Sequence, residues 1–283
     1  MEAASVVNNR ERLPSDLQQM VTVAKYDVLK HLRSKRLLGL VILEALLLGL
    51  TFALPLLLGV DPTDDPAGYM SAFVSWVEIL VIIGATMFAG DAIVSEFQSR
   101  TGYLLFPNPV KRSTIFVGKY LSTLGIIVLM LVVYYGVAAA LVFAMTGGGT
   151  LLSLYSMLLA CAYGAAAAAL GFLISSVFKG STGSLVLTFF TLFMILPMIA
   201  QLLPAGSIKP WFVLTFCGHV ISYIMISPYP TDLVDSISLG NGEFMEYWTY
   251  YPDIGGSLAV MGGYVLICLA LGMYLFRRKE MVS

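Results

Sequence analysis

Residues 71–94 read SAFVSWVEILVIIGATMFAGDAIV, and residues 95–112 continue as SEFQSRTGYLLFPNPVKR. The first stretch is longer than the about 20 apolar residues with which a helix crosses a bilayer. The second stretch is charged, contains two prolines and leads into another apolar run at 118–146. We therefore expect the chain to cross a membrane, turn in a polar connection and cross back.

Apolar runs of similar length recur on both sides of this connection. Hydrophobic residues make up 58% of the 283 residues and charged residues only 12%, against about 25% charged residues in a typical soluble domain. This composition excludes a disordered chain and a nucleic-acid-binding domain, and it argues against a soluble globule. We predict an all-α polytopic membrane protein whose 37–276 domain has six spans, at 37–59, 71–94, 118–146, 151–178, 185–203 and 254–276.

The distribution of Lys and Arg predicts the orientation of these spans. If residues 1–36 are cytoplasmic and 208–227 does not span, all 16 basic residues except Lys209 lie inside. The outer loops then carry mainly acids: Asp61, Asp64, Asp65, Asp232, Asp235, Glu243, Glu246 and Asp253. Because cytoplasmic loops are rich in Lys and Arg, we expect both termini inside, including the basic tail 277–283.

Two further segments are expected to lie along the membrane rather than across it. Residues 208–227 are expected to form a non-spanning helix, re-entrant or surface-lying, within the outer segment 204–253, and their aromatic residues serve either as boundary anchors or as substrate contacts. Residues 15–33 form an amphipathic helix, either at the inner leaflet or packed as an ordinary cytoplasmic helix. Its apolar side chains fall on one arc at helical spacing: Leu17, Val21, Ala24, Val28 and Leu32.

The sequence lacks the usual signatures of catalysis. It contains no Gly-x-x-x-x-Gly-Lys-Ser/Thr, no His-Glu-x-x-His and no Gly-x-Ser-x-Gly. We therefore expect no enzyme activity and no cofactor or metal bound by this chain. Three acids lie within spans, Glu44, Glu78 and Asp91. Charges at that depth are costly, so these acids either contact a translocated solute or form structural hydrogen bonds.

The connection after the second span is the most informative segment. We expect the helix to continue to Glu96, and a short helix to end before Pro107, since the residue before proline disfavours helical geometry. Arg100 is placed to pair with Glu96 one turn away. The apolar residues Tyr103, Leu104, Leu105 and Phe106 would then form either a docking patch or part of a rigid elbow.

This connection resembles the corresponding segment of ABC-2 type permeases, the membrane subunits of many ABC exporters. The matching residues are Asp91, Glu96, Gly102, Leu104, Leu105, Pro109, Val110, Arg112, Gly118 and Lys119. Phe97 or Gln98 stands where the family often has a second acid, and Tyr103 stands in place of a threonine. The layout of six spans, an N-terminal amphipathic helix and a non-spanning outer helix is also similar.

The resemblance implies a permease in the plasma membrane of a prokaryote, acting with two separate ATP-binding subunits that hold ATP and Mg. It also implies a second permease chain, identical or paralogous, and no nucleic-acid partner. Residues 92–106, within the coupling segment 92–112, would be the coupling helix. Its docking residues would be Glu96, Arg100, Gly102, Tyr103, Leu104, Leu105 and Phe106, supported by the motif residues Asp91, Pro109, Arg112 and Lys119.

Two other classes of function compete with this interpretation. An ion-coupled secondary transporter or channel would use Glu44, Glu78 and Asp91 as a relay, but internal repeats and paired broken helices are not visible. An intramembrane enzyme would need a catalytic constellation, which the sequence does not offer.

Overall fold

Long helices make up most of the molecule. The computed structural model describes residues 15–59, 65–98, 111–238 and 244–278. Within these residues six helical stretches are long and apolar enough to cross a membrane, which confirms the all-α polytopic fold. They are α2 (Lys35–Leu57), α3 to α5 (Pro66–Glu96), α7 (Arg112–Thr146), α8 (Leu152–Val177), α9 to the short helix η2 (Ser181–Gly206) and α13 (Ile254–Arg278).

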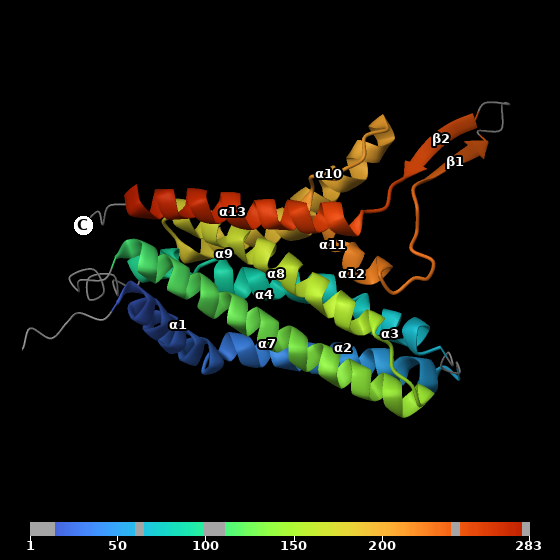
Figure 1. Cartoon of the computed structure of the whole chain (residues 1–283), viewed down its shortest axis with the longest axis horizontal. Coiled ribbons are helices and arrows are strands. Elements are labelled where there is room, and N and C mark those ends of the chain that lie inside the picture. Colours follow the sequence, from blue (N-terminus) through green and yellow to red (C-terminus); the bar gives the residue numbers. More distant parts are fainter. Residues whose placement is uncertain (1–14, 60–64, 99–110, 239–243, 279–283) are drawn as a thin grey trace, which may run out of the picture.

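Helix α8 lies in the middle of the bundle and packs against α13, α7 and α4 (Val77–Ala89) (Figure 1). Small residues on α8 make these close approaches possible. A Cβ atom added at Gly164 would lie 2.9 Å from Ile127, and one at Gly171 would lie 2.8 Å from the Cβ of Ala89. Small residues let helix backbones approach closely, so this stripe sets the packing distance within the bundle.

The amphipathic helix expected at 15–33 is α1 (Asp16–Leu32), which begins with a capping box between Ser15 and Gln18. It packs along the first turns of α7, where Met20 and Val23 lie against Gly118. Leu17 and Val21, on the apolar arc, remain 65% and 58% exposed. Leu32 is also exposed, so these three residues are available to lipid, whereas Val28 packs against the core.

The second span is not one continuous helix, contrary to our expectation. It consists of α3 (Pro66–Val74), α4 and α5 (Val94–Gln98), and residues 90–93 form a turn between the last two. The hydroxyl oxygen of Ser175, on α8, accepts the amides of Ile93 and Val94, both at 3.0 Å. Ser184, on α9 (Ser181–Phe190), donates to the carbonyl of Gly90. In a continuous helix these backbone groups would bond to each other within the helix. Here side chains from two other spans satisfy them instead.

The fifth span bends partway along. After α9 the chain makes a π-helical turn, η1 (Thr191–Ile195), then α10 (Leu196–Leu202) and η2 (Leu203–Gly206). Pro197 has no amide hydrogen, and its ring would clash with the carbonyl of Phe193 in a regular helix. The wider turn accommodates this proline, and α10 leans away from the bundle (Figure 1).

The 204–253 segment departs from the expected single helix. It contains two short helices, α11 (Leu214–Gly218) and α12 (Val220–Tyr223), and an antiparallel hairpin of β1 (Leu233–Ser238) and β2 (Phe244–Thr249). The hairpin, which the sequence analysis did not anticipate, projects beyond the helices (Figure 1). We call this end of the bundle the hairpin end, and the opposite end, which holds α1 and the last turn of α13, the α1 end.

Candidate functional site

A buried cluster of three charged side chains lies at the α1 end, where α5 leaves the bundle. The Lys119 Nζ atom, on α7, donates to Glu96 Oε1 at 2.8 Å and to Asp27 Oδ1 at 3.2 Å. Only 6% of the Lys119 side chain is exposed, against 9% for Asp27 and 12% for Glu96. Because charges at such burial are stable only when paired, this cluster ties α7, α5 and α1 together.

Asp27 is the member of this cluster that sequence reasoning missed. His31, one turn further along α1, places its Nε2 atom 3.2 Å from Asp27 Oδ2. Burial by itself raises the pKa of the Asp27 carboxyl, but His31 and the charge of Lys119 outweigh it and hold that pKa well below its usual range. Asp27 is therefore charged. The one available signal was its position on α1, off the apolar arc and four residues before a histidine.

A second cluster surrounds Asp91 in the turn between α4 and α5. The two carboxylate oxygens of Asp91 accept both terminal nitrogens of Arg36, at 2.9 and 2.8 Å. Asp91 also accepts the Ser181 hydroxyl at 2.8 Å, and Gln98 accepts the Ser181 amide at 2.9 Å. Arg36 donates in addition to the carbonyl of Met87 at 2.9 Å. This cluster joins α2, the turn and the start of α9.

The motif residues in the described part of the chain thus lie together where the connection after the second span leaves the bundle and returns to it. Asp91, Glu96 and Lys119 belong to the two clusters, and the Arg112 guanidinium donates to the carbonyl of Arg277 at 3.0 Å. Glu96 faces the bundle, where it can position the connection. The remaining predicted residues lie outside the described part of the chain, so docking on them stays a prediction: Arg100, Gly102, Tyr103, Leu104, Leu105, Phe106 and Pro109.

A cleft of about 400 Å³ opens beside the Lys119 cluster, between α1 and α7. Lys30 lies at this cleft, with its Nζ atom 3.5 Å from Glu96 Oε1 and 62% of its side chain exposed. The residues that line the cleft are Thr22, Val23, Tyr26, Asp27, Lys30, Glu96, Ile115 and Lys119. Polar and apolar groups therefore lie side by side next to the end of the second span.

The two acids that were expected on the translocation path have different environments. Glu44, on α2, is 3% exposed, and its Oε1 atom has no hydrogen-bond partner among the described residues. Glu78, on α4, lies toward the hairpin end, where its Oε2 atom is 3.0 Å from Nδ1 of His219. Glu44 is the more unusual of the two, since an unsatisfied buried polar atom costs about 1–3 kcal/mol.

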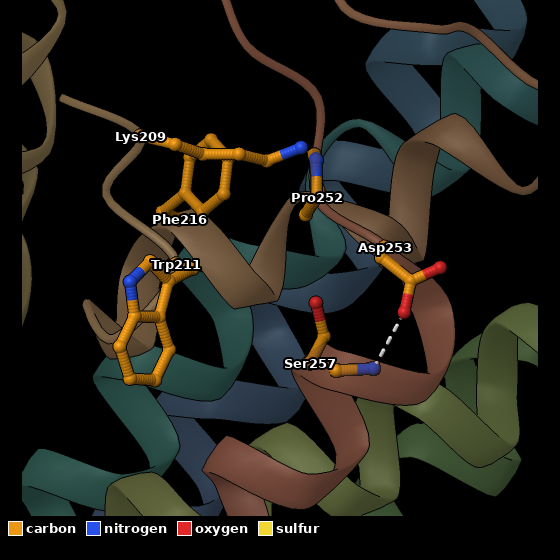
Figure 2. A pocket seen from close by; sticks show the side chains of 7 residues that line it. Lys209, Trp211, Phe216, Pro252, Asp253 and Ser257 are labelled. Carbon is orange, nitrogen blue, oxygen red and sulfur yellow. Dashed lines mark hydrogen bonds between the residues drawn. The ribbon is translucent and has the colours of Figure 1, made fainter.

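A small cavity lies within the 204–253 segment, where it meets the start of α13 (Figure 2). Its volume is about 70 Å³, and its lining residues are Lys209, Trp211, Phe216, Pro252, Asp253, Gly256 and Ser257. The Lys209 ammonium is already paired with Asp232, at 2.8 Å from Oδ2. A space of this size holds water rather than a cargo molecule. Within the described residues there is also no group of three His, Cys, Asp or Glu side chains that could hold a metal.

Comparison with known proteins agrees with this arrangement. The family described as ABC-2 family transporter protein matches residues 21–281, which include all six spans and both charged clusters. No protein of curated function matches the chain. Since the family match covers nearly the whole chain, the chain belongs to the ABC-2 family of transporter proteins, as a multi-pass permease of an ABC transporter.

Proposed function

We propose that this chain is the permease subunit of an ABC exporter, in which two permease chains form the path and two separate ATP-binding subunits drive it. In this proposal the segment 92–106 is the coupling helix on which the ATP-binding subunit docks. The observation that carries the proposal is the pair of charged clusters at the base of that segment.

The clusters offer a physical route for coupling. A displacement of the inner connection acts through Glu96 on Lys119 and α7, and through Asp91 on Arg36 and α2. Removing one partner from a buried ion pair costs about 3–5 kcal/mol. A push from the ATP-binding subunit would therefore move α7 before it separates Glu96 from Lys119, whereas the Arg36–Asp91 pair, whose Arg36 side chain is 45% exposed, adds a weaker link.

The location and partners follow from the same proposal. The α1 end would face the cytoplasm of a prokaryote, with both termini on that side. The sequence has no P-loop, so ATP and Mg would be held by the partner subunit. The fifth and sixth spans are largely uncovered by the rest of the chain, which leaves apolar surface for lipid and for a second permease chain, identical or paralogous.

Replacement of Leu104 and Leu105 by Asp tests the docking role. The double substitution would place unpaired charge against an apolar groove, so the chain should still insert and dimerise but no longer co-purify with the ATP-binding subunit. The matched control is the double substitution by Met, which keeps both positions apolar and should retain the partner. Unchanged partner recovery with the Asp variant would contradict the docking role, as would poor insertion of both variants.

Glu44 favours a second candidate, an ion-coupled transporter, because it is a buried, unpaired carboxyl group within a span. Transport in sealed vesicles separates the two candidates. The exporter requires ATP and tolerates collapse of the ion gradients, whereas the ion-coupled transporter fails when they collapse and is disabled by Glu44→Gln.

A further inference from the structure

The helices α11 and α12 cover the ends of α3 and α8 at the hairpin end of the bundle. Their closest approach is at Gly218. A Cβ atom added there would lie 3.0 Å from the ring of Tyr163, on α8, and 3.2 Å from Oε1 of Glu78, on α4. The α11–α12 segment therefore packs directly against α8 and α4, and we call this contact its seat.

Two polar contacts join the α11–α12 segment to α8 and α4, and they differ in chemistry. The hydroxyl of Ser156, on α8, donates to the carbonyl of Ile221 at 2.7 Å, a contact without titratable groups in the ordinary pH range. The other contact joins Glu78 and His219, which titrate. Within the described residues this is the only ion pair between the 204–253 segment and a span.

Among the described residues, one charged group faces His219. The titratable side chains that face it or the Glu78 carboxylate are Glu78 from α4, Tyr163 from α8, Tyr223 from α12, and Tyr251, which follows β2 and packs on Tyr223. Tyrosines are neutral in the ordinary pH range. Burial by itself lowers the pKa of His219, but the hydrogen bond and charge of Glu78 outweigh it and raise the pKa above its usual value. A raised histidine pKa means that the pair stabilises the seat at acid pH, and that this stabilisation is lost as pH rises through the raised value.

We propose that the Glu78–His219 pair is a proton-operated latch, which holds the α11–α12 segment on the spans when His219 is protonated and releases it in alkaline medium. In the proposed orientation this medium is the outer one, and release uncovers the ends of the spans where cargo would leave; that part rests on the proposed function. The latch itself concerns contacts within this chain alone.

The native Cys217 provides a reporter. It is 1% exposed, lies two residues before His219, and its thiol donates to the carbonyl of Trp211 at 3.2 Å. Burial raises the pKa of this thiol to about 11, so it reacts when the segment lifts. The experiment measures the rate at which N-ethylmaleimide modifies Cys217 in the purified full chain, located by mass spectrometry, at about pH 6 and about pH 9, on either side of the usual histidine pKa.

The matched variant is His219→Gln, which keeps a hydrogen-bond donor but does not titrate. Comparing wild type and variant at the same pH removes the general effect of pH on thiol reactivity. Since partly exposed ion pairs are worth up to about 1 kcal/mol, wild type should react about threefold more slowly than His219→Gln at acid pH, and equally fast at alkaline pH. A nearby imidazolium would by itself speed a thiol reaction, so slower labelling cannot come from local charge.

Two further variants complete the test. In Glu78→Gln, Cys217 should react as fast as in His219→Gln at each pH, because the charge partner of His219 is removed. In Ser156→Ala, Cys217 should react faster than in wild type at both pH values, because the hydrogen bond to Ile221 is lost. The dependence of this rate on pH should stay as in wild type, because the Glu78–His219 pair is intact. A ratio of wild type to His219→Gln that is the same at both pH values would overturn the latch, as would loss of the pH dependence in Ser156→Ala. No ATP-binding subunit is needed, so failure here is distinct from failure of the proposed function.

Discussion

Lys119 shows at the scale of one residue what the structure adds to the family pattern. The resemblance identified it only as part of a motif, whereas its ammonium group bridges two carboxylates that come from different helices. An ammonium group has three donors and can serve both partners at once. The three side chains exclude most solvent, so their charges depend on each other.

Substitution of Lys119 by Met is predicted to destabilise the chain by about 3–5 kcal/mol, because Asp27 and Glu96 would remain largely buried and would lose the ammonium group that bridges them. Thermal unfolding in detergent measures this loss. The triple variant Lys119→Met, Asp27→Asn, Glu96→Gln should recover most of the lost stability, because it removes the unpaired charges. A triple variant no more stable than Lys119→Met would show that the charges are not responsible.

Only some site residues could be predicted from the sequence. Asp91, Glu96 and Lys119 were identified because they lie within one short motif. Asp27 was missed because its partner is far along the chain on another helix. His219 belongs to no motif in the sequence, and its pairing with Glu78 depends on how α11 packs against α4. Hydropathy and spacing do not contain that information.

At the scale of elements, the second span shows how packing overrides a local pattern. The apolar run favours a continuous helix, yet the chain turns at 90–93 because Ser175 accepts two amides from that turn. Gly171, one turn before Ser175, allows α8 to come close enough for these contacts. The small residues of α8 thus do more than set a packing distance, since they also shape the turn at 90–93.

Substitution of Gly171 by Ala is predicted to push α8 away from Ala89 and to cost about 1–3 kcal/mol, as overpacking usually does. The matched control is Gly136→Ala on α7, where an added Cβ meets nothing within 4 Å. The control should unfold at the wild-type temperature or slightly above. Equal effects of the two substitutions on the unfolding temperature would argue against the close approach.

The β1–β2 hairpin was missed for a different reason. Neither strand alternates strictly between apolar and polar residues, because β1 reads LVDSIS and β2 reads FMEYWT, so the period-two signal of a strand is absent. The available signal for a hairpin was the run of turn-forming residues between the two strands, Gly240, Asn241 and Gly242.

For the whole molecule, the number of spans could be predicted because a bilayer imposes it. Backbone groups within lipid must be satisfied internally, so each long apolar run becomes a helix. The bends within the second and fifth spans could not be predicted in the same way, since they depend on contacts between spans and, in the fifth, on the turn before Pro197.

The proposed orientation predicts opposite labelling of two exposed glycines. An added Cβ meets nothing within 4 Å at Gly149, between α7 and α8, or at Gly180, between α8 and α9. In a background without the native cysteines, Gly149→Cys should react with an impermeant thiol reagent in intact cells, and Gly180→Cys only after permeabilisation. Labelling of both from one side would contradict six spans, and the reversed pattern would contradict the orientation.

The central claim is that this permease is driven through its inner connection by a separate ATP-binding subunit. The most direct test is photolabelling with an azido-ATP probe after the tagged chain is purified from its native membrane in mild detergent. The account predicts label on a second polypeptide and none on this chain, and loss of that labelled polypeptide when Leu104 and Leu105 are replaced by Asp but not by Met. Label on this chain itself, or an equal amount of labelled partner with the Asp variant, would contradict it.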